Sequence, residues 1–334
     1  MMDYATFKTV VEKNIKNYLP EDFKDAQVEV TKIMKVNRTK EALTIRPDKD
    51  TNIASNFYLE DMYEYYRECD DLDEVLGSLA DEYIKDTENY KNIGVPELTK
   101  EYVEDNVVMI LINTESNKDL LQNVPHREVN DCSVIYRIML SMDSRGIAST
   151  IVDNRIADDS GMTEQELFAI AVENTKRILP AKIKPMTSVI KEMMAGQGMP
   201  GEIAESVTAA IMPGDEMMWV LSNDIGVNGA VNMLYDENLH ELAEKLNDDL
   251  YILPSSIHEV ICVAASGEEP EELAGLMQEV SMTTVRLEDR LSNQVYHYDK
   301  DLRKLTMATD TPNRRIDGIV AEQPLIYGGK EQKR

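Results

Sequence analysis

The run Val107-Val108-Met109-Ile110-Leu111-Ile112 is short and wholly apolar, and it decides how the rest of the chain is interpreted. An uninterrupted apolar run of this length is typical of a buried strand. Further on, Cys132-Ser133-Val134-Ile135-Tyr136-Arg137-Ile138-Met139-Leu140 places apolar residues at alternate positions before a turn at 143–146, and 147–152 supplies a return strand. These stretches predict an antiparallel sheet in the middle of the chain.

The residues before this sheet show helical and hairpin patterns. Apolar residues at helical spacing predict helices over 3–19, 56–67 and 71–92, and alternation around a polar turn predicts a hairpin over 27–46. Asp70, Asp71 and Asp73 crowd the start of the third helix. Because acids there complement the helix dipole and cap free amide groups, we interpret them as a helix start rather than a cation site.

The residues after the sheet continue in the same style. Thr163 and Glu166 have capping-box spacing before a helix that ends at Pro180. A turn at 228–229 between the apolar runs 218–221 and 231–235 predicts another hairpin. The remaining patterns predict helices at 239–246 and 269–281 and strands at 250–253 and 260–263.

Hairpins followed by helices favour an α+β fold over a doubly wound parallel sheet. We expect N-terminal helices and a hairpin joined to a mainly antiparallel sheet of hairpins with helices packed on it. The expected regions are an N-terminal helical and hairpin region at 1–105, a sheet domain at 106–309 with a Met- and Gly-rich insertion near 185–216, and a loosely ordered tail at 310–334.

Charge is the unusual feature of the composition. Lys and Arg number 35 and Asp and Glu number 62, which gives 35 − 62 = −27. Direct binding to nucleic acid or to an anionic membrane is disfavoured, because either would need a basic patch. Acidity of this size can serve general solubility, or it can imitate the charge of nucleic acid and occupy a basic partner protein.

Cysteine and histidine usage gives no sign of a metal or cofactor. Cys69, Cys132 and Cys262 are far apart in the sequence, as expected of reduced core residues, and there is no CxxC pair or HExxH motif. No apolar run approaches the roughly 18 residues of a membrane span, and no secretory leader opens the chain. We therefore expect a cytoplasmic protein without cofactors.

Four segments carry a resemblance: Asp131-Cys132-Ser133-Val134-Ile135-Tyr136, Ile170-Ala171-Val172-Glu173-Asn174-Thr175, Trp219-Val220-Leu221-Ser222, and residues 250–259. They resemble an uncharacterised family of gut Firmicutes, domain of unknown function 5688, over most of the chain. A more distant likeness links the chain to another uncharacterised family of Bacillus-type bacteria. The resemblance implies a bacterial, cytoplasmic origin and carries over no catalytic residue.

Catalytic motifs are missing, because neither a Gly-rich phosphate loop nor a GxSxG elbow occurs. The most suggestive cluster is Ser255, Ser256, His258 and Glu259, which groups hydroxyls, an imidazole and a carboxylate as acid/base or nucleophilic chemistry needs. Ser256 and Glu259 also have S-x-x-E spacing, so a capped turn between two strands explains the motif without chemistry. We favour the structural interpretation.

Two features indicate binding. Residues 56–105 contain 16 acidic and 4 basic residues, a net of −12, and predict an acidic helical face that includes Glu60, Glu64, Asp81 and Glu88. Residues 185–218 hold seven methionines around the breaker-rich stretch 195–201. Methionine is common on adaptable binding surfaces, so Met193, Met194 and Met199 belong either to a mobile flap or to a core beneath an insertion.

Two function classes follow. The first is a non-enzymatic interaction protein with a protein partner, in its sharper form an acidic inhibitor of a nucleic-acid-handling or defence protein. The alternative is a hydrolase-type enzyme with a site around Ser255, His258 and Glu259. A concave pocket with convergent polar groups would favour the enzyme, and a convex acidic ridge would favour the inhibitor.

Overall fold

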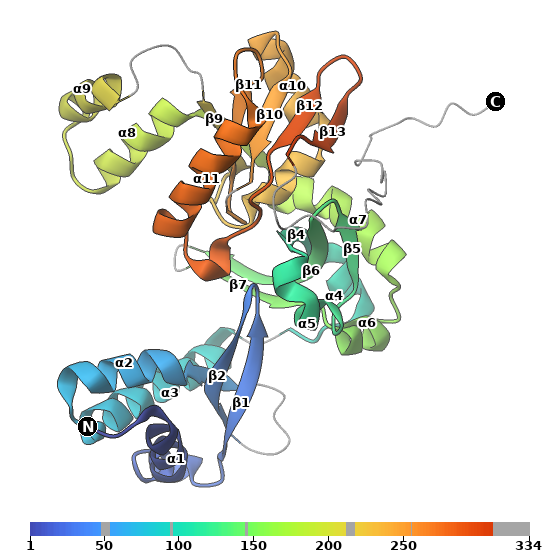
Figure 1. Ribbon diagram of the computed structural model, residues 1–334. Helices are drawn as coiled ribbons and strands as arrows, with labels where there is room; N and C mark the ends of the chain where they lie inside the picture. Colours follow the sequence, from blue (N-terminus) through green and yellow to red (C-terminus); the bar gives the residue numbers. More distant parts are fainter. Residues whose placement is uncertain (48–53, 94–95, 144–145, 212–217, 255, 310–334) are drawn as a thin grey trace. The chain divides into compact units, whose positions relative to one another are not determined.

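The computed structural model describes residues 1–309 apart from 48–53, 94–95, 144–145, 212–217 and 255 (Figure 1). The chain divides into two compact units, unit 1 (Met1–Glu97) and unit 2, which begins at Leu98. Each unit combines helices with antiparallel sheet, so the predicted α+β class is confirmed. The predicted tail at 310–334 lies outside the described residues.

Unit 1 is a three-stranded sheet packed with helices. Its elements are α1 (Tyr4–Asn14), η1 (Ile15–Asn17), η2 (Glu21–Phe23), β1 (Gln27–Lys35), β2 (Arg38–Arg46), β3 (Ser55–Tyr58), α2 (Leu59–Cys69) and α3 (Leu72–Ile93). The strand order is β1-β2-β3, and the β1–β2 hairpin closes at the pair Lys35↔Arg38, as expected for 27–46. The helix predicted from residue 56 begins at Leu59, because Ser55–Tyr58 pairs with β2 instead.

The core of unit 1 is rich in aromatic rings. Phe7 of α1 stacks on Tyr66 of α2 at 5.4 Å between ring centroids, and Tyr83 of α3 is fully buried. Acidic residues cap the N-termini of α1 and α3. Asp3 accepts a hydrogen bond from the Thr6 amide at 2.8 Å, and Asp71 accepts from the first amides of α3, so the predicted helix start is confirmed.

Unit 2 holds two antiparallel sheets and their helices. Its elements are α4 (Lys100–Asn106), β4 (Val107–Asn113), η3 (Glu115–Asn117), α5 (Lys118–Leu121), β5 (His126–Val129), β6 (Cys132–Asp143), β7 (Gly146–Ile151), α6 (Asn154–Ser160), α7 (Glu164–Ile178), β8 (Ala181–Pro185), α8 (Met186–Gly196), α9 (Gly201–Ile211), β9 (Met218–Asn223), η4 (Gly229–Leu234), α10 (Asp236–Leu246), β10 (Leu250–Leu253), β11 (Val260–Ala264), α11 (Pro270–Thr284), η5 (Leu287–Asp289), β12 (Tyr296–Asp299) and β13 (Lys304–Met307). The division after Glu97 falls eight residues before the boundary expected at 105/106, because α4 contacts α7 and β6 and so belongs to unit 2.

The first sheet has the order β4-β6-β5, with β7 also paired to β6. Every residue of β4 is buried, and the Met109 amide donates a hydrogen bond of 2.9 Å to the Thr175 hydroxyl of α7. The capping box of α7 forms as predicted, because Thr163 and Glu166 bond to each other's backbone amides. The buried strand expected at 107–112 and the hairpin expected over 132–152 are both confirmed.

The second sheet has the order β13-β12-β10-β11-β9-β8. The hairpin predicted over 218–235 is wrong: residues 229–234 form the 3-10 helix η4, and all six are buried. β9 is already paired on both sides, with β8 and β11, so no free edge remains for a strand at 231–235. The strands β10 and β11 form as predicted.

None of the helices in the described part of the chain is long and apolar enough to cross a membrane. All three cysteines are free thiols. Cys132 in β6 and Cys262 in β11 are buried, which raises the pKa of both thiols, in the case of Cys262 to about 12. Cys69, at the end of α2, is half-buried.

Candidate functional site

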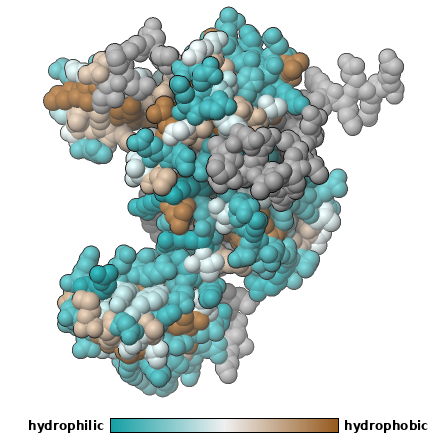
Figure 2. Space-filling model, viewed as in Figure 1, coloured by the Kyte–Doolittle hydropathy of each residue, from teal (hydrophilic) through white to brown (hydrophobic). Residues whose placement is uncertain are grey.

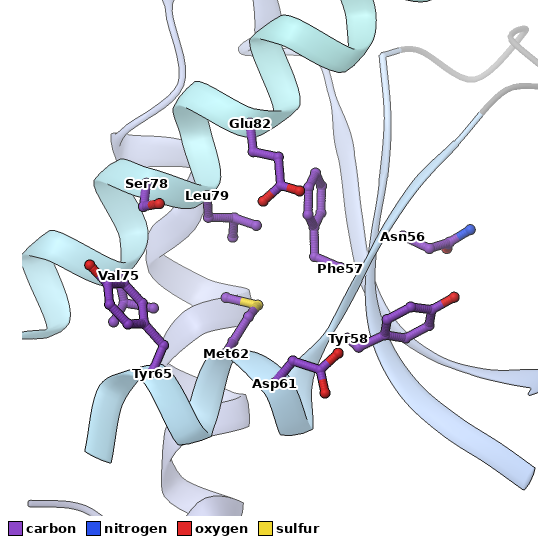
Figure 3. Close-up of a pocket in the computed structure, with 10 residues that line it drawn as sticks. All are labelled: Asn56, Phe57, Tyr58, Asp61, Met62, Tyr65, Val75, Ser78, Leu79 and Glu82. Carbon is purple, nitrogen blue, oxygen red and sulfur yellow. The ribbon is translucent and has the colours of Figure 1, made fainter. Parts of the chain in front are cut away.

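A pocket of about 330 Å³ opens in unit 1 between β3, α2 and α3 (Figure 3). In Figure 3 the side chains of the two helices approach it from opposite sides, and β3 forms a third wall. The ten lining residues are Asn56, Phe57, Tyr58, Asp61, Met62, Tyr65, Val75, Ser78, Leu79 and Glu82. The volume lies within the range of small-ligand sites, roughly 300–1,000 Å³.

Helical spacing explains why two helices can contribute so many residues. Val75, Ser78, Leu79 and Glu82 follow the i, i+3, i+4, i+7 pattern and therefore share one face of α3. On α2, Asp61 and Tyr65 are one turn apart. The buried Val75 and Leu79 form an apolar floor, whereas Glu82, at the far end of the same face, is exposed.

β3 contributes an aromatic wall that is fixed by the sheet. Phe57 pairs with Leu43 and is 7% exposed, so its ring belongs to both the core and the pocket. Asn56 is held by the Thr44 hydroxyl, which donates to its Oδ1 at 2.7 Å. These contacts give the pocket a rigid side, which lowers the entropic cost of binding.

The rim of the pocket already holds one cation. The Lys40 ammonium lies 4.4 Å from the centroid of the Tyr58 ring and 3.6 Å from Oδ2 of Asp61, and the Lys40 side chain is only 12% exposed. A phenol face and a carboxylate together favour a cation that has lost much of its water. Tyr65 stays a neutral hydrogen-bond donor, because its bond of 2.6 Å to Glu74 raises the pKa of the phenol.

The residue types of the pocket suit binding better than catalysis. Its lining combines aromatic rings, an apolar floor and two carboxylates, and it includes no His, Cys or Lys. None of the ten lining residues is therefore a histidine or lysine base or a cysteine nucleophile. The arrangement fits a cation that carries an apolar stem.

The acids of the predicted acidic face lie on the two helices that line the pocket, although none of them is a lining residue. Glu60, Glu64, Asp81 and Glu88 are all exposed, the first two on α2 and the others on α3. Glu60 directly precedes Asp61, and Asp81 precedes Glu82. Sequence reasoning missed the two lining carboxylates and the tyrosines beside them, although the interleaving of Tyr and acid over 56–66 is a visible signal.

The Met-rich segment is a helical pair, and the loop expected at 195–201 is limited to the residues between the two helices. α8 runs to Gly196 and α9 starts at Gly201, so only residues 197–200 connect them. Met193 is 60% exposed, while Met194 and Met199 are half-buried. No residue of α8 is buried, and Figure 2 shows apolar surface gathered over this helical pair.

The segment that carried the catalytic candidates connects β10 and β11, as the structural interpretation expected. Ser255 lies outside the described residues. His258 uses both ring nitrogens: Nδ1 accepts from the Asn228 amide at 3.2 Å, and Nε2 is 3.2 Å from Oδ1 of Asp289. Since Nδ1 accepts, the ring proton sits on Nε2 and is directed at Asp289.

Ser256 and Glu259 are also engaged in local structure. The buried Ser256 hydroxyl accepts from the His258 amide at 3.0 Å rather than capping a helix, because strand β11 follows. Burial raises the pKa of Glu259, and the electrostatic interaction with His258 and a hydrogen bond from Ser256 partly offset this. His258 thus ties the segment to Asn228 and Asp289, whereas the side chains of Ser256 and Glu259 interact within the segment itself.

Two buried acid clusters in unit 2 were also missed. Asp131, in the turn before β6, accepts from the Ser292 hydroxyl at 2.6 Å and from the Tyr296 hydroxyl, and burial raises its pKa. Asp236 accepts from the Tyr298 hydroxyl at 2.6 Å and pairs with Arg303. Their partners lie more than 60 positions away, so no local motif marks them.

The described residues thus define an α+β protein with antiparallel sheets and an acidic, aromatic pocket in its first unit. The chain belongs to DUF5688, a family of unknown function, which it matches over residues 4–300. No curated protein and no solved structure is significantly similar to it.

Proposed function

We propose that the protein is a non-enzymatic, cytoplasmic interaction protein whose unit 1 binds a partner protein with a basic surface. The observation that carries the proposal is the pocket of unit 1, where Tyr58 and Phe57 stand beside the carboxylates of Asp61 and Glu82. Aromatic rings supply contact area, and carboxylates select for positive charge. Interfaces are commonly anchored by a few side chains of this kind.

The exposed acids of α2 and α3 support a protein partner over a small molecule. Glu60, Glu64, Asp81 and Glu88 extend the negative charge along α2 and α3 beyond the pocket. Such rim charges contribute little affinity each, but they steer an oppositely charged partner and raise the association rate. A basic protein surface could use both the pocket and its rim.

The test is a charge-reversal experiment with a matched control. One variant changes Glu60, Glu64, Asp81 and Glu88 to Lys. The control reverses four exposed acids of unit 2, Asp158, Glu241, Glu272 and Glu279. Each variant has a net charge of −27 + 8 = −19, so a difference between them reports position and not total charge.

Proteins captured from native lysate by wild type and control, but lost with the unit 1 variant, are purified for kinetics. We expect the unit 1 reversal to lower the association rate by about tenfold or more, and salt to mimic it as the Debye length shrinks from about 10 Å at 0.1 M to about 3 Å at 1 M. Equal rates for both variants at both salt concentrations would refute the proposal. Competition by duplex DNA would support the sharper form, an inhibitor of a nucleic-acid-handling or defence protein.

The hydrolase-type enzyme remains the second candidate. The observation in its favour is the half-buried Glu259, whose raised pKa suits a general acid, next to the His258–Asp289 pair. Activity of the full chain toward a panel of ester and peptide substrates, abolished by His258→Ala and retained by the pocket variant Glu82→Gln, would establish it. Absence of turnover across the panel would leave the interaction protein as the better description.

A further inference from the structure

We propose that the pocket of unit 1 takes the side chain of an arginine on the partner protein. The inference rests on the proposed function and deepens it, because it names the chemical group that the pocket recognises. Its starting point is the pair of carboxylates, Asp61 from α2 and Glu82 from α3, at a pocket with aromatic and aliphatic walls.

The two carboxylates differ in how their charge is satisfied. Asp61 is near Lys40, whose ammonium also faces the Tyr58 ring, so this end already holds a cation. Glu82 forms no ion pair with any residue that the structure describes. The charge that a ligand would complement is therefore at the α3 end of the pocket.

The walls near that end specify more than a positive charge. Phe57 and Leu79 are 7% and 4% exposed and offer an apolar surface for the stem of a long side chain. Glu82 then meets the charged head, an arrangement in which long basic side chains bury their methylene groups and keep the charge at the rim. A compact inorganic cation would leave these walls uncovered.

A guanidinium fits the site better than an ammonium. Its flat face stacks on an aromatic ring while its edge donates several hydrogen bonds to carboxylates, and it is more weakly hydrated than an ammonium. Tyr65, which is 39% exposed, and Phe57 supply aromatic surface, and Glu82 supplies the acceptor oxygens. The single-point ammonium position beside Asp61 is already taken by Lys40.

The arginine belongs to a protein chain rather than to the free amino acid. Free arginine would bring its α-carboxylate toward Asp61 and Glu82 and toward two helices on which Glu60, Glu64 and Asp81 are exposed. A peptide replaces this negative group with neutral amides. The same acids would then face other basic residues of the partner.

The probe is a blocked arginine, N-acetyl-arginine methylamide, titrated into the full chain carrying 13C-methyl methionine. Met62 lines the pocket, and its signal is identified by its loss in Met62→Leu. We expect the Met62 signal to move progressively toward saturation with blocked arginine and to move far less with blocked lysine, free arginine or blocked citrulline, the neutral isostere. Equal responses to citrulline and arginine would overturn the inference, as would no response to arginine.

Two variants then locate the charge that matters. Glu82→Gln should raise the dissociation constant of blocked arginine about two- to fivefold, the range of an exposed ion pair of roughly 0.4–1 kcal/mol. Glu88→Gln, an exposed acid on the same helix outside the pocket lining, should leave it unchanged. Equal effects of the two variants would show that the general field, and not the pocket, attracts the probe.

The outcomes separate this inference from the proposed function. If charge reversal on α2 and α3 abolishes partner binding while blocked arginine leaves the Met62 methyl signal unchanged, the interaction protein is supported and the arginine site is refuted. If blocked arginine binds in a Glu82-dependent way but charge reversal leaves the captured proteins unchanged, the arginine site is supported and its assignment to a protein partner is refuted.

Discussion

Gly229, the first residue of η4, lies where η4 closely approaches β9 and the segment before β11, and its replacement by alanine tests that contact. A Cβ at this position would lie 2.4 Å from Oγ of Ser222, 2.6 Å from the carbonyl oxygen of His258 and 2.8 Å from the backbone nitrogen of Asn223. The Gly229 amide also donates to the His258 carbonyl at 3.0 Å. Two of the three crowded atoms belong to the backbone, so no rotamer change clears the space.

The expected cost can be worked out from these contacts. Overpacking of a well-packed site costs about 1–3 kcal/mol, and weakening the hydrogen bond to His258 adds about 1 kcal/mol. The free energy of unfolding should therefore fall by about 2–4 kcal/mol. In a unit of this size 1 kcal/mol corresponds to roughly 2–4 °C, so the melting temperature should fall by roughly 4–16 °C.

Trp219 makes the assay specific to unit 2. It is the only tryptophan of the chain, lies in β9 and is 3% exposed, so its fluorescence follows the unfolding of the sheet next to Gly229. The matched control is Gly275→Ala in α11, where an added Cβ meets nothing within 4 Å. Alanine in a helix interior should stabilise by about 0.5–1 kcal/mol.

Removing the side chain of Ser222 separates the causes. The double variant Gly229→Ala/Ser222→Ala relieves the 2.4 Å contact but leaves both backbone contacts, so it should recover only part of the stability. A Gly229→Ala protein that melts with the wild type would refute the reasoning. So would full recovery in the double variant.

Three further predictions concern other parts of unit 2. Burial raises the pKa of Asp131 above its ordinary value of 3.8, so its stabilising contribution is complete below that value and is lost as the pH rises through the raised pKa. The asparagine in Asp131→Asn carries no titrating proton, so the urea midpoint of this variant should rise relative to that of the wild type as the pH rises. Urea midpoints that change in parallel with pH in the two proteins would contradict this. Thr163→Ala removes the capping box of α7 and should cost about 0.5–2 kcal/mol, with no further loss when Glu166→Ala is added if the two residues act as one unit. Limited proteolysis should cut first at 197–200, between α8 and α9, and first cuts elsewhere would show that this connection is packed.

Elements with a strong local pattern could be predicted from the sequence. The apolar run 107–112 became β4, because burial on both faces requires apolar residues at every position. The capping box at Thr163 could also be predicted from the sequence, because its two partners are three residues apart. The run 231–235 was misassigned because it is as apolar as a strand. It cannot pair with β9 because β8 and β11 already occupy both edges of that strand.

Edge strands were harder to see. β8, with the sequence Ala181-Lys182-Ile183-Lys184-Pro185, lies at the edge of the larger sheet and was missed. Lysine and proline protect such edges from pairing with other chains, and the same residues make the segment look unlike a strand.

None of the residues singled out in the sequence lines the pocket of unit 1. The acids of α2 and α3 were identified as an exposed face, but the pocket between them was not. Its third wall is β3, and residues 56–58 were assigned to the following helix. A concavity depends on how three elements pack, whereas sequence periodicity reports only one element at a time.

The positions of the three thiols allow local opening of the structure to be measured by alkylation. Cys132 lies in one sheet of unit 2 and Cys262 in the other, and both are buried, whereas Cys69 lies half-buried in unit 1. Alkylation requires a thiolate that the reagent can reach, so the two buried cysteines react only when their strands separate. Site-resolved alkylation rates under native conditions would therefore measure the opening free energy of each sheet independently, without denaturant and without an introduced label.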